Sequence, residues 1–241
     1  MTKEKMGLNR TQIKYIAIIS MLIDHTAALL LPPEKYPALT VLYVFMRTIG
    51  RIAGPVMFYF LAEGYRYTSS KLKYGLRLLS FGILSQVLYS LARYGETSLE
   101  TLNVMFTLFM SFIMLVITDK LKTKVWQGIA VSAIMFLTAF SDWGVMGPFI
   151  VWLFYIYHED RKKQLISYAS LCMAQLVTAI LIVPAGNIEW YEAVWQTGIF
   201  LPMILLYLYN REPGRKTIIN KWSFYLFYPM QFFTFWLILK A

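Results

Sequence analysis

The stretch that decides the fold reads Ile16-Ala-Ile-Ile-Ser-Met-Leu-Ile-Asp-His-Thr-Ala-Ala-Leu-Leu-Leu31, an apolar run that carries Asp24 and His25 side by side. It lies within a predicted membrane-spanning helix at residues 11–31, which has the length that a bilayer requires. A charge near the middle of a bilayer costs at least about 2.5–3.5 kcal/mol on insertion scales. An acid and an imidazole at that depth therefore need a partner, a water-filled cavity or a chemical role.

The composition of the whole chain is that of an integral membrane protein. Its 241 residues are 58% hydrophobic and only 15% charged, whereas a soluble domain has about 25% charged residues. We predict an all-α, polytopic helical bundle in which residues 1–241 form a single transmembrane domain. The predicted spans, about nine in number, are residues 11–31, 38–62, 74–93, 101–119, 125–141, 143–157, 165–183, 191–209 and 222–240. The fifth and sixth are short and meet almost without a loop at 141–144, which is typical of a tight or partly re-entrant hairpin.

The distribution of lysine and arginine predicts the orientation of the chain. Eighteen basic residues lie before or at the start of the first predicted span and around every second connection between spans, so they share one side of the membrane. They are Lys3, Lys5, Arg10, Lys14, Arg66, Lys71, Lys73, Arg77, Lys120, Lys122, Lys124, Arg161, Lys162, Lys163, Arg211, Arg215, Lys216 and Lys221. The positive-inside rule then places the N-terminus in the cytoplasm of a bacterial-type cell, with the protein in its cytoplasmic membrane. Because this rule accounts for the net charge of +10, we expect the lipid bilayer, and no nucleic acid, as a partner.

The second predicted span supplies candidate partners for Asp24. Arg47 and Arg51 are four residues apart and therefore share one face of a helix. At 1.5 Å per residue, Asp24, His25 and Arg47 lie at a common depth if the two spans pack antiparallel. Gly50 would let a neighbouring backbone approach. Pro55 in the same span predicts a kink, and the two guanidiniums suit an anionic ligand such as a pyrophosphate.

Two interpretations of this group of charges remain open. An Asp24–Arg47 ion pair could serve only to lock two helices together. The adjacent His25 favours acid–base chemistry instead, because an ion pair does not require an imidazole.

Residues at a span end such as Trp190, Tyr191 and Trp195 are typical of interfacial anchors.

Other polar residues at membrane depth are weaker candidates. Gln86, Asn103, Gln175 and Gln231 would bridge helices or line a cavity, and Asp142 with Trp143 would line a cavity at the outer hairpin. The chain has two histidines and one cysteine, so we expect no transition-metal site.

Two stretches resemble a known family. Lys14 to His25, and Arg47-Thr-Ile-Gly-Arg-Ile-Ala-Gly-Pro-Val-Met-Phe-Tyr-Phe-Leu-Ala-Glu-Gly-Tyr65, are similar to the TraX family, named for the F-pilin N-acetyltransferase. Shorter matches are Thr68, Tyr74, Arg77-Leu78, Asn103, Asp142-Trp143-Gly144 and Tyr228-Pro229. The resemblance implies an integral-membrane acetyltransferase that uses acetyl-CoA as its acyl donor.

The first two spans also resemble the wider acyltransferase-3 group, in which a basic residue precedes a catalytic histidine by the spacing of Lys14 and His25. By that likeness His25 is the base and Lys14 a contact to the phosphates of CoA. One position departs from the expected pattern, because Gln231 stands where a histidine would follow the terminal Tyr228-Pro229.

We therefore predict transfer of an acetyl group from cytoplasmic acetyl-CoA to an amine or hydroxyl at or beyond the outer face. The acceptor stays open between a pilin-like peptide, a glycan, a lipid and a small molecule. His25 and Asp24 would be catalytic, while Lys14, Arg47 and Arg51 would bind the donor. Asn103, Asp142, Trp143, Tyr228 and Gln231 would line the substrate cavity. A transporter or flippase for an anionic solute would use the same buried charges without covalent chemistry. A membrane scaffold that docks partner helices would depend on its lipid-facing helix surfaces and not on His25.

Overall fold

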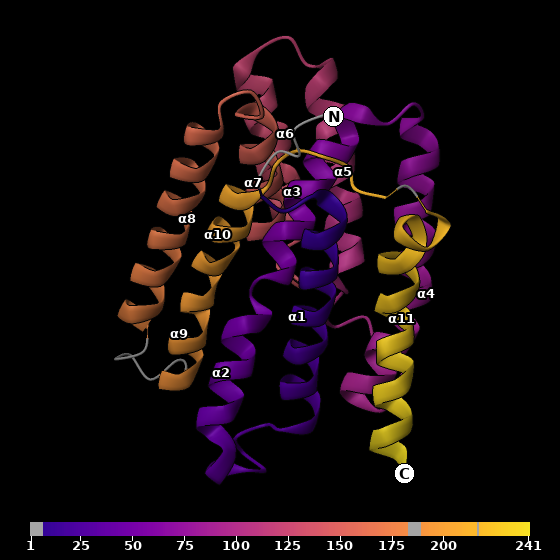
Figure 1. The fold of residues 1–241 in the computed structure, drawn as a ribbon, viewed down its shortest axis with the longest axis vertical. Helices are drawn as coiled ribbons and strands as arrows, with labels where there is room; N and C mark the ends of the chain where they lie inside the picture. The colour runs from indigo at the N-terminus through magenta and orange to yellow at the C-terminus, as the bar shows by residue number, and fades with distance from the viewer. Residues whose placement is uncertain (1–6, 183–188, 216) are drawn as a thin grey trace. The chain divides into compact units, whose positions relative to one another are not determined.

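The computed structural model describes residues 7–182, 189–215 and 217–241, and within these ranges the regular structure is helical (Figure 1). The predicted spans correspond to α1 (Arg10–Leu30), α2 (Thr40–Gly50), α3 (Ala53–Tyr67), α4 (Lys71–Tyr94), α5 (Val104–Lys120), α6 (Lys124–Leu137), α7 (Met146–Ile156), α8 (Arg161–Ile182), α9 (Trp190–Gln196), α10 (Leu201–Leu208) and α11 (Ile218–Lys240). Short 3-10 turns are η1 (Pro37–Leu39) and η3 (Thr197–Phe200). Lys3, Lys5 and Lys216 of the charge pattern, and residue 183 of the seventh predicted span, lie outside the described residues.

Several helical segments have the length and composition of membrane spans. Within the part of the chain that the structure describes, five are long and apolar enough to cross a bilayer: Arg10–Leu30, Pro37–Tyr67, Lys71–Tyr94, Arg161–Leu181 and Trp190–Leu208. Lys124–Leu137 and Met146–Ile156 are apolar but shorter, as the sequence predicts for the fifth and sixth spans. The predicted class, a helical protein with several candidate spans, is thereby confirmed. The number nine and the orientation stay predictions.

The second predicted span is broken, at the position that places the two arginines. Helix α2 ends at Gly50 and α3 begins at Ala53. Pro55 has no N–H to donate to the carbonyl of Arg51, four residues earlier, and its ring crowds that carbonyl. Before Pro55 the backbone forms hydrogen bonds between residues three apart, from the Ile52 amide to the Ile49 oxygen (3.1 Å) and from the Arg51 amide to the Thr48 oxygen (3.3 Å). The predicted kink is confirmed as a full interruption.

Side-chain caps fix the starts of the helices that carry the candidate residues. Asn9 and Gln12 form a capping box on α1, with the Gln12 amide 3.0 Å from the Asn9 side chain. Ser70 caps α4, and Asn103 caps α5 through the amide of Met105 at 2.9 Å. Such caps satisfy backbone donors that the helix itself leaves open. They define where each helix begins and hence which face its polar residues occupy.

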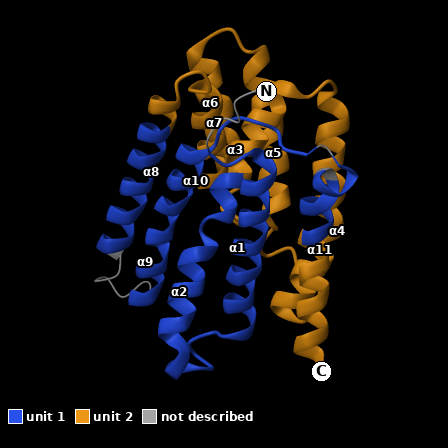
Figure 2. Ribbon diagram, viewed as in Figure 1, with its two compact units in different colours: residues 1–56, 165–227 blue, residues 57–164, 228–241 orange. Residues whose placement is uncertain are grey.

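The chain divides into two compact units, each discontinuous in sequence (Figure 2). Unit 1 comprises residues 1–56 and 165–227, and unit 2 comprises residues 57–164 and 228–241. In unit 1, α2 packs against α1, α9 and η3; in unit 2, α5 packs against α4, α6 and α7. Unit 1 contains Asp24, His25, Arg47 and Arg51, whereas the predicted cavity-lining residues all belong to unit 2.

Candidate functional site

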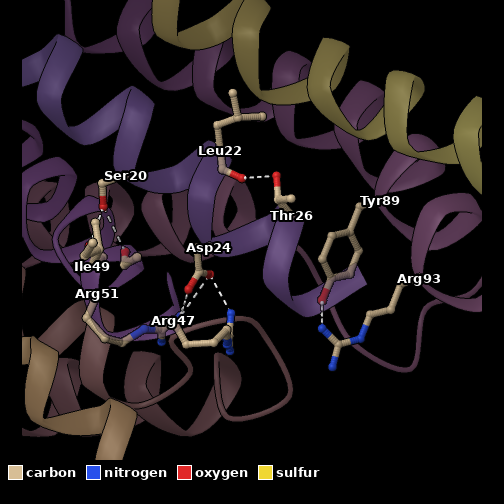
Figure 3. Close-up of polar contacts among 10 residues, drawn as sticks. Ser20, Leu22, Asp24, Thr26, Arg47, Ile49, Arg51, Tyr89 and Arg93 are labelled. Atoms are coloured by element: carbon tan, nitrogen blue, oxygen red, sulfur yellow. Dashed lines mark hydrogen bonds and ion pairs between the residues drawn. The ribbon is translucent and has the colours of Figure 1, made fainter. Parts of the chain in front are cut away.

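An ion-pair cluster in unit 1 joins α1 to the end of α2. Asp24 accepts hydrogen bonds from Arg47 Nη1 (2.7 Å to Oδ2) and from Arg51 Nη2 (3.0 Å to Oδ2 and 3.1 Å to Oδ1), as Figure 3 shows. The side chains are largely enclosed, with 9% of Asp24, 14% of Arg47 and 15% of Arg51 exposed. Helix spacing and depth predicted this cluster from the sequence. One carboxylate faces two guanidiniums, so these three side chains together carry two positive charges and one negative charge.

A very close approach of two backbones produces this contact. A methyl group on Gly50 would lie 2.1 Å from Asp24 Oδ1 and 2.4 Å from Asp24 Cβ. One helical turn earlier, the Ser20 hydroxyl donates to the Ile49 carbonyl at 2.7 Å. The buried residues of α1 also include the small side chains Ala17 and Ala27. The absence of a side chain at Gly50 therefore allows the carboxylate to reach both arginines.

The ring of Trp195 covers the arginines from α9. Arg47 Cζ lies 4.5 Å and Arg51 Cζ 4.7 Å from the centroid of this ring, within the range of cation–π attraction. Helix α9 and the following turn are held against α2, since a methyl group on Gly198 would lie 2.1 Å from the carbonyl oxygen of Thr48. The sequence predicted an interfacial anchor at Trp195. The structure places the ring in the charged cluster.

An aromatic and acidic rim adjoins the same cluster in unit 1. The Tyr43 ring lies 6.0 Å from Arg47 Cζ and edge-on to Tyr191, with 6.0 Å between the ring centroids. The Tyr191 hydroxyl donates to Glu34 at 3.0 Å. These contacts continue the charged cluster toward the loop that joins α1 to α2.

His25 and Lys14 share one face of α1. Residues eleven apart differ by about 20° around a helix, and they are separated by about 16 Å along its axis. Both side chains are half-buried, and Ile18 and Met21 between them are buried. His25 points about 100° away from Asp24 around the helix. The Asp24 carboxylate is engaged with the two arginines, which favours the role of holding them over that of orienting His25.

Unit 2 holds the remaining predicted residues, beginning with a pair of buried amides. The Gln86 carbonyl oxygen accepts from the backbone and side-chain nitrogens of Asn103, both at 2.9 Å, and its nitrogen donates to the carbonyls of Ser98 (3.1 Å) and Thr101 (3.0 Å). The predicted helix-bridging role of these amides is confirmed between α4 and α5. Asn103 also lines a cavity of about 320 Å³ in unit 2, whose wall is otherwise apolar except for Gln86.

Asp142 and Trp143 form the predicted tight turn between α6 and α7. The Asp142 amide donates to the Leu102 carbonyl at 2.7 Å, and the Asp142 carbonyl accepts from the Thr107 hydroxyl at 2.6 Å. Trp143 has φ of +61°, which costs a residue with a side chain on the order of 1–3 kcal/mol. Its ring packs edge-on against Phe58 at 5.7 Å. This packing holds the turn against α3 and α5.

Tyr228 and Gln231 occupy one buried stretch of α11 in unit 2. Tyr228 is fully buried and packs edge-on against Phe232, whose ring also meets Tyr89 of α4. Gln231 is only 4% exposed, and neither atom of its amide makes a hydrogen bond among the described residues. The predicted bridging role is thus not seen for Gln231, whereas Gln175 does bridge α8 and α9 by donating to Gln196 at 3.2 Å.

A second polar cluster in unit 2 has no counterpart in the sequence analysis. Asp119 accepts from the hydroxyls of Tyr65 (2.6 Å) and Tyr155 and from Lys71 Nζ (3.0 Å). It ties the ends of α3, α5 and α7 to the start of α4. Lys71, Asp119 and Tyr155 are far apart in sequence, and Asp119 stands beside Lys120 at the end of a predicted span, where a charged residue is ordinary, so no local pattern marks the cluster. Among the described residues, no group of three or more His, Cys, Asp or Glu side chains could hold a metal ion.

Comparison with known proteins assigns the family. A family model described as "TraX protein" matches residues 9–239. The chain is also 30% identical over 227 residues, 91% of each protein, to a Dichelobacter nodosus protein described as "Probable fimbrial assembly protein FimC, serogroup H1". No solved structure matches. The resemblance found in the two N-terminal stretches is therefore confirmed over most of the chain, which belongs to the TraX protein family.

Proposed function

We propose that this protein transfers an acetyl group from cytoplasmic acetyl-CoA to an amine or hydroxyl acceptor at or beyond the outer face of a bacterial cytoplasmic membrane. Membership of the TraX family, which is associated with acetylation of F-pilin, supports the reaction class. The observation that carries the proposal is the enclosed cluster of Asp24, Arg47 and Arg51, with His25 next to Asp24 in sequence on the same helix. A bilayer-spanning helix holds such charges at considerable cost, which is typical of functional sites.

The orientation that goes with this function follows the positive-inside rule, with about nine spans and a cytoplasmic N-terminus. Lys14 would then lie near the cytoplasmic end of α1, where it would contact the phosphates of CoA. The pantetheine arm would run along the α1 face that Lys14 shares with His25. The thioester would thus come to the depth of the arginines.

His25 would act as the base. As the acceptor nitrogen or oxygen forms a bond to the acetyl carbon, its proton passes to His25, and the carbonyl oxygen takes up a negative charge. The carbon–sulfur bond then breaks, and His25 returns the proton to the departing CoA thiolate. Arg47 and Arg51 would stabilise the negative oxygen, and Asp24 would hold their guanidiniums in place.

The test is acetyl transfer in isolated membranes supplied with labelled acetyl-CoA. We expect His25→Ala to lower the rate by about 10²–10⁴-fold, the usual contribution of general acid–base catalysis. The chain offers one matched control, His158→Ala, in the connection between α7 and α8. Full activity in the His25 variant would contradict the assigned base. Movement of an unmodified anionic solute, without transfer of label, would favour the transporter.

A further inference from the structure

We propose that Trp195 completes the anion site: its indole N–H, together with Arg47 and Arg51, binds the single negative oxygen that forms on the acetyl carbon during transfer. This inference rests on the proposed function and names a residue for it that the sequence pattern did not. The group bound is a monoanionic oxygen, and the three donors come from α9, α2 and the break after α2.

The Trp195 indole contacts both arginines through the face of its ring. The centroid of the Trp195 ring lies 4.5 Å from Arg47 Cζ and 4.7 Å from Arg51 Cζ. The indole ring is therefore in contact with both guanidiniums. Cation–π attraction accounts for the position of the ring, but it uses the face of the indole and makes no use of its N–H.

Two hydrogen-bond donors of this cluster are enclosed and make no hydrogen bond among the described residues. Trp195 Nε1 and Arg47 Nε are both shielded from solvent, and neither makes a hydrogen bond among the described residues. A buried indole N–H usually finds a partner, because a donor that is removed from water without one loses its hydrogen bond to solvent. Two open donors in one cluster indicate an acceptor atom that arrives with a ligand.

The charges of the two guanidiniums and the Asp24 carboxylate also favour an anionic ligand group. Asp24 compensates one of the two guanidiniums by direct ion pairs. Asp24, Arg47 and Arg51 together carry two positive charges and one negative charge, so a ligand group with one negative charge matches these three side chains better than a dianion does. In acetyl transfer the tetrahedral intermediate carries one such charge, on the former carbonyl oxygen. Donors fixed before the reaction stabilise that charge without rearrangement.

The packing of α9 against α2 holds the Trp195 indole in place. Helix α9 is a short element of seven residues, and it is fixed against α2 by the close approach of Gly198 to the Thr48 carbonyl. Tyr191, one turn before Trp195, is anchored by its hydrogen bond to Glu34 and its edge contact with Tyr43. The indole is thus positioned by packing on both sides before any ligand binds.

The experiment compares Trp195→Phe, which keeps an aromatic face for the arginines but removes the N–H, with Trp190→Phe on the same helix. Trp190 is 55% exposed and lies outside the cluster. The readouts are kcat and KM for acetyl-CoA in membranes, with the melting temperature of the purified protein as a check on folding. We expect Trp195→Phe to lower kcat by about 10²-fold, the loss of one oxyanion donor, with KM changed less than about twofold. Trp195→His, which retains a ring N–H, should recover part of the loss.

The outcomes separate the two proposals. If the wild-type protein transfers no acetyl group, the proposed function fails and the role of Trp195 fails with it. If the wild type is active and Trp195→Phe is equally fast, only the role of Trp195 is overturned. A raised KM with unchanged kcat would also overturn it, because the N–H would then bind the donor before any negative oxygen forms.

Discussion

Replacing Gly50 by alanine tests the close contact of α1 and α2 on which the ion-pair cluster depends. The added methyl group would lie 2.1 Å from Asp24 Oδ1 and 2.4 Å from Asp24 Cβ, where ordinary contact begins at 3.4 Å. Rotation of the Asp24 side chain cannot relieve the clash, because Cβ moves only with the backbone. The two helices must therefore separate by about 1 Å.

The energetic consequence has two parts. Forcing an extra carbon into a packed interface costs about 1–3 kcal/mol. A separation of 1 Å would also stretch the 2.7 Å bond between Arg47 and Asp24 beyond hydrogen-bond distance, and a polar contact in a membrane protein contributes up to about 1–2 kcal/mol. The higher helix propensity of alanine offsets at most about 1 kcal/mol. We expect Gly50→Ala to lower the free energy of unfolding by about 2–3 kcal/mol.

The assay is unfolding of the purified protein in mixed micelles by a denaturing detergent, followed by circular dichroism. Gly128→Ala is the matched control, since a methyl group there meets no atom within 4 Å, and it should be neutral or stabilising by up to about 1 kcal/mol. The double variant Gly50→Ala/Asp24→Ala should not recover stability, because the Cβ atom of residue 24 remains. Equal unfolding of Gly50→Ala and wild type would refute the close approach.

Three further substitutions test other contacts by the same unfolding assay. Gly198→Ala should destabilise the protein by at least about 1–3 kcal/mol, because its methyl group would lie 2.1 Å from a backbone oxygen that cannot rotate away; wild-type stability would contradict the seating of α9 on α2. Gln86→Leu should cost about 1–3 kcal/mol by removing the partners of Asn103 and of two carbonyls, and a neutral effect would show that water replaces the amide. Tyr65→Phe should cost about 0.5–1.5 kcal/mol through loss of its bond to Asp119, with the ring packing retained; a larger loss would point to rearrangement of the whole Asp119 cluster.

The part of the site on α1 and α2 could be predicted because its determinants are local. Helix periodicity places Arg47 and Arg51 on one face, and a short connection makes two consecutive spans antiparallel neighbours. Charges of opposite sign at the same depth in neighbouring apolar spans are expected to pair, because an unpaired charge there is costly. The break after Gly50 likewise follows from Pro55 alone.

Trp195 could not be predicted as part of the site, because an aromatic residue near the end of a span has the composition of an interfacial anchor. Its contact with Arg47 joins residues 148 positions apart and depends on how α9 packs on α2. The Asp119 cluster likewise depends on how helices pack, because the two tyrosines that bond to Asp119 lie on two other helices. Gln231 is the reverse case: a polar residue that suggested a bridge is buried without a hydrogen bond among the described residues.

The amino-acid sequence by itself determined the membrane class, the helices and the pairing of Asp24 with the arginines, because apolar length, helical period and buried charge act over one or two turns or between consecutive helices. Only the tertiary structure decided how closely the backbones of α1 and α2 approach at Gly50, and that an indole from a distant helix covers the two guanidiniums. Those features depend on shape complementarity between surfaces remote in sequence, for which no local pattern of residues carries a signal.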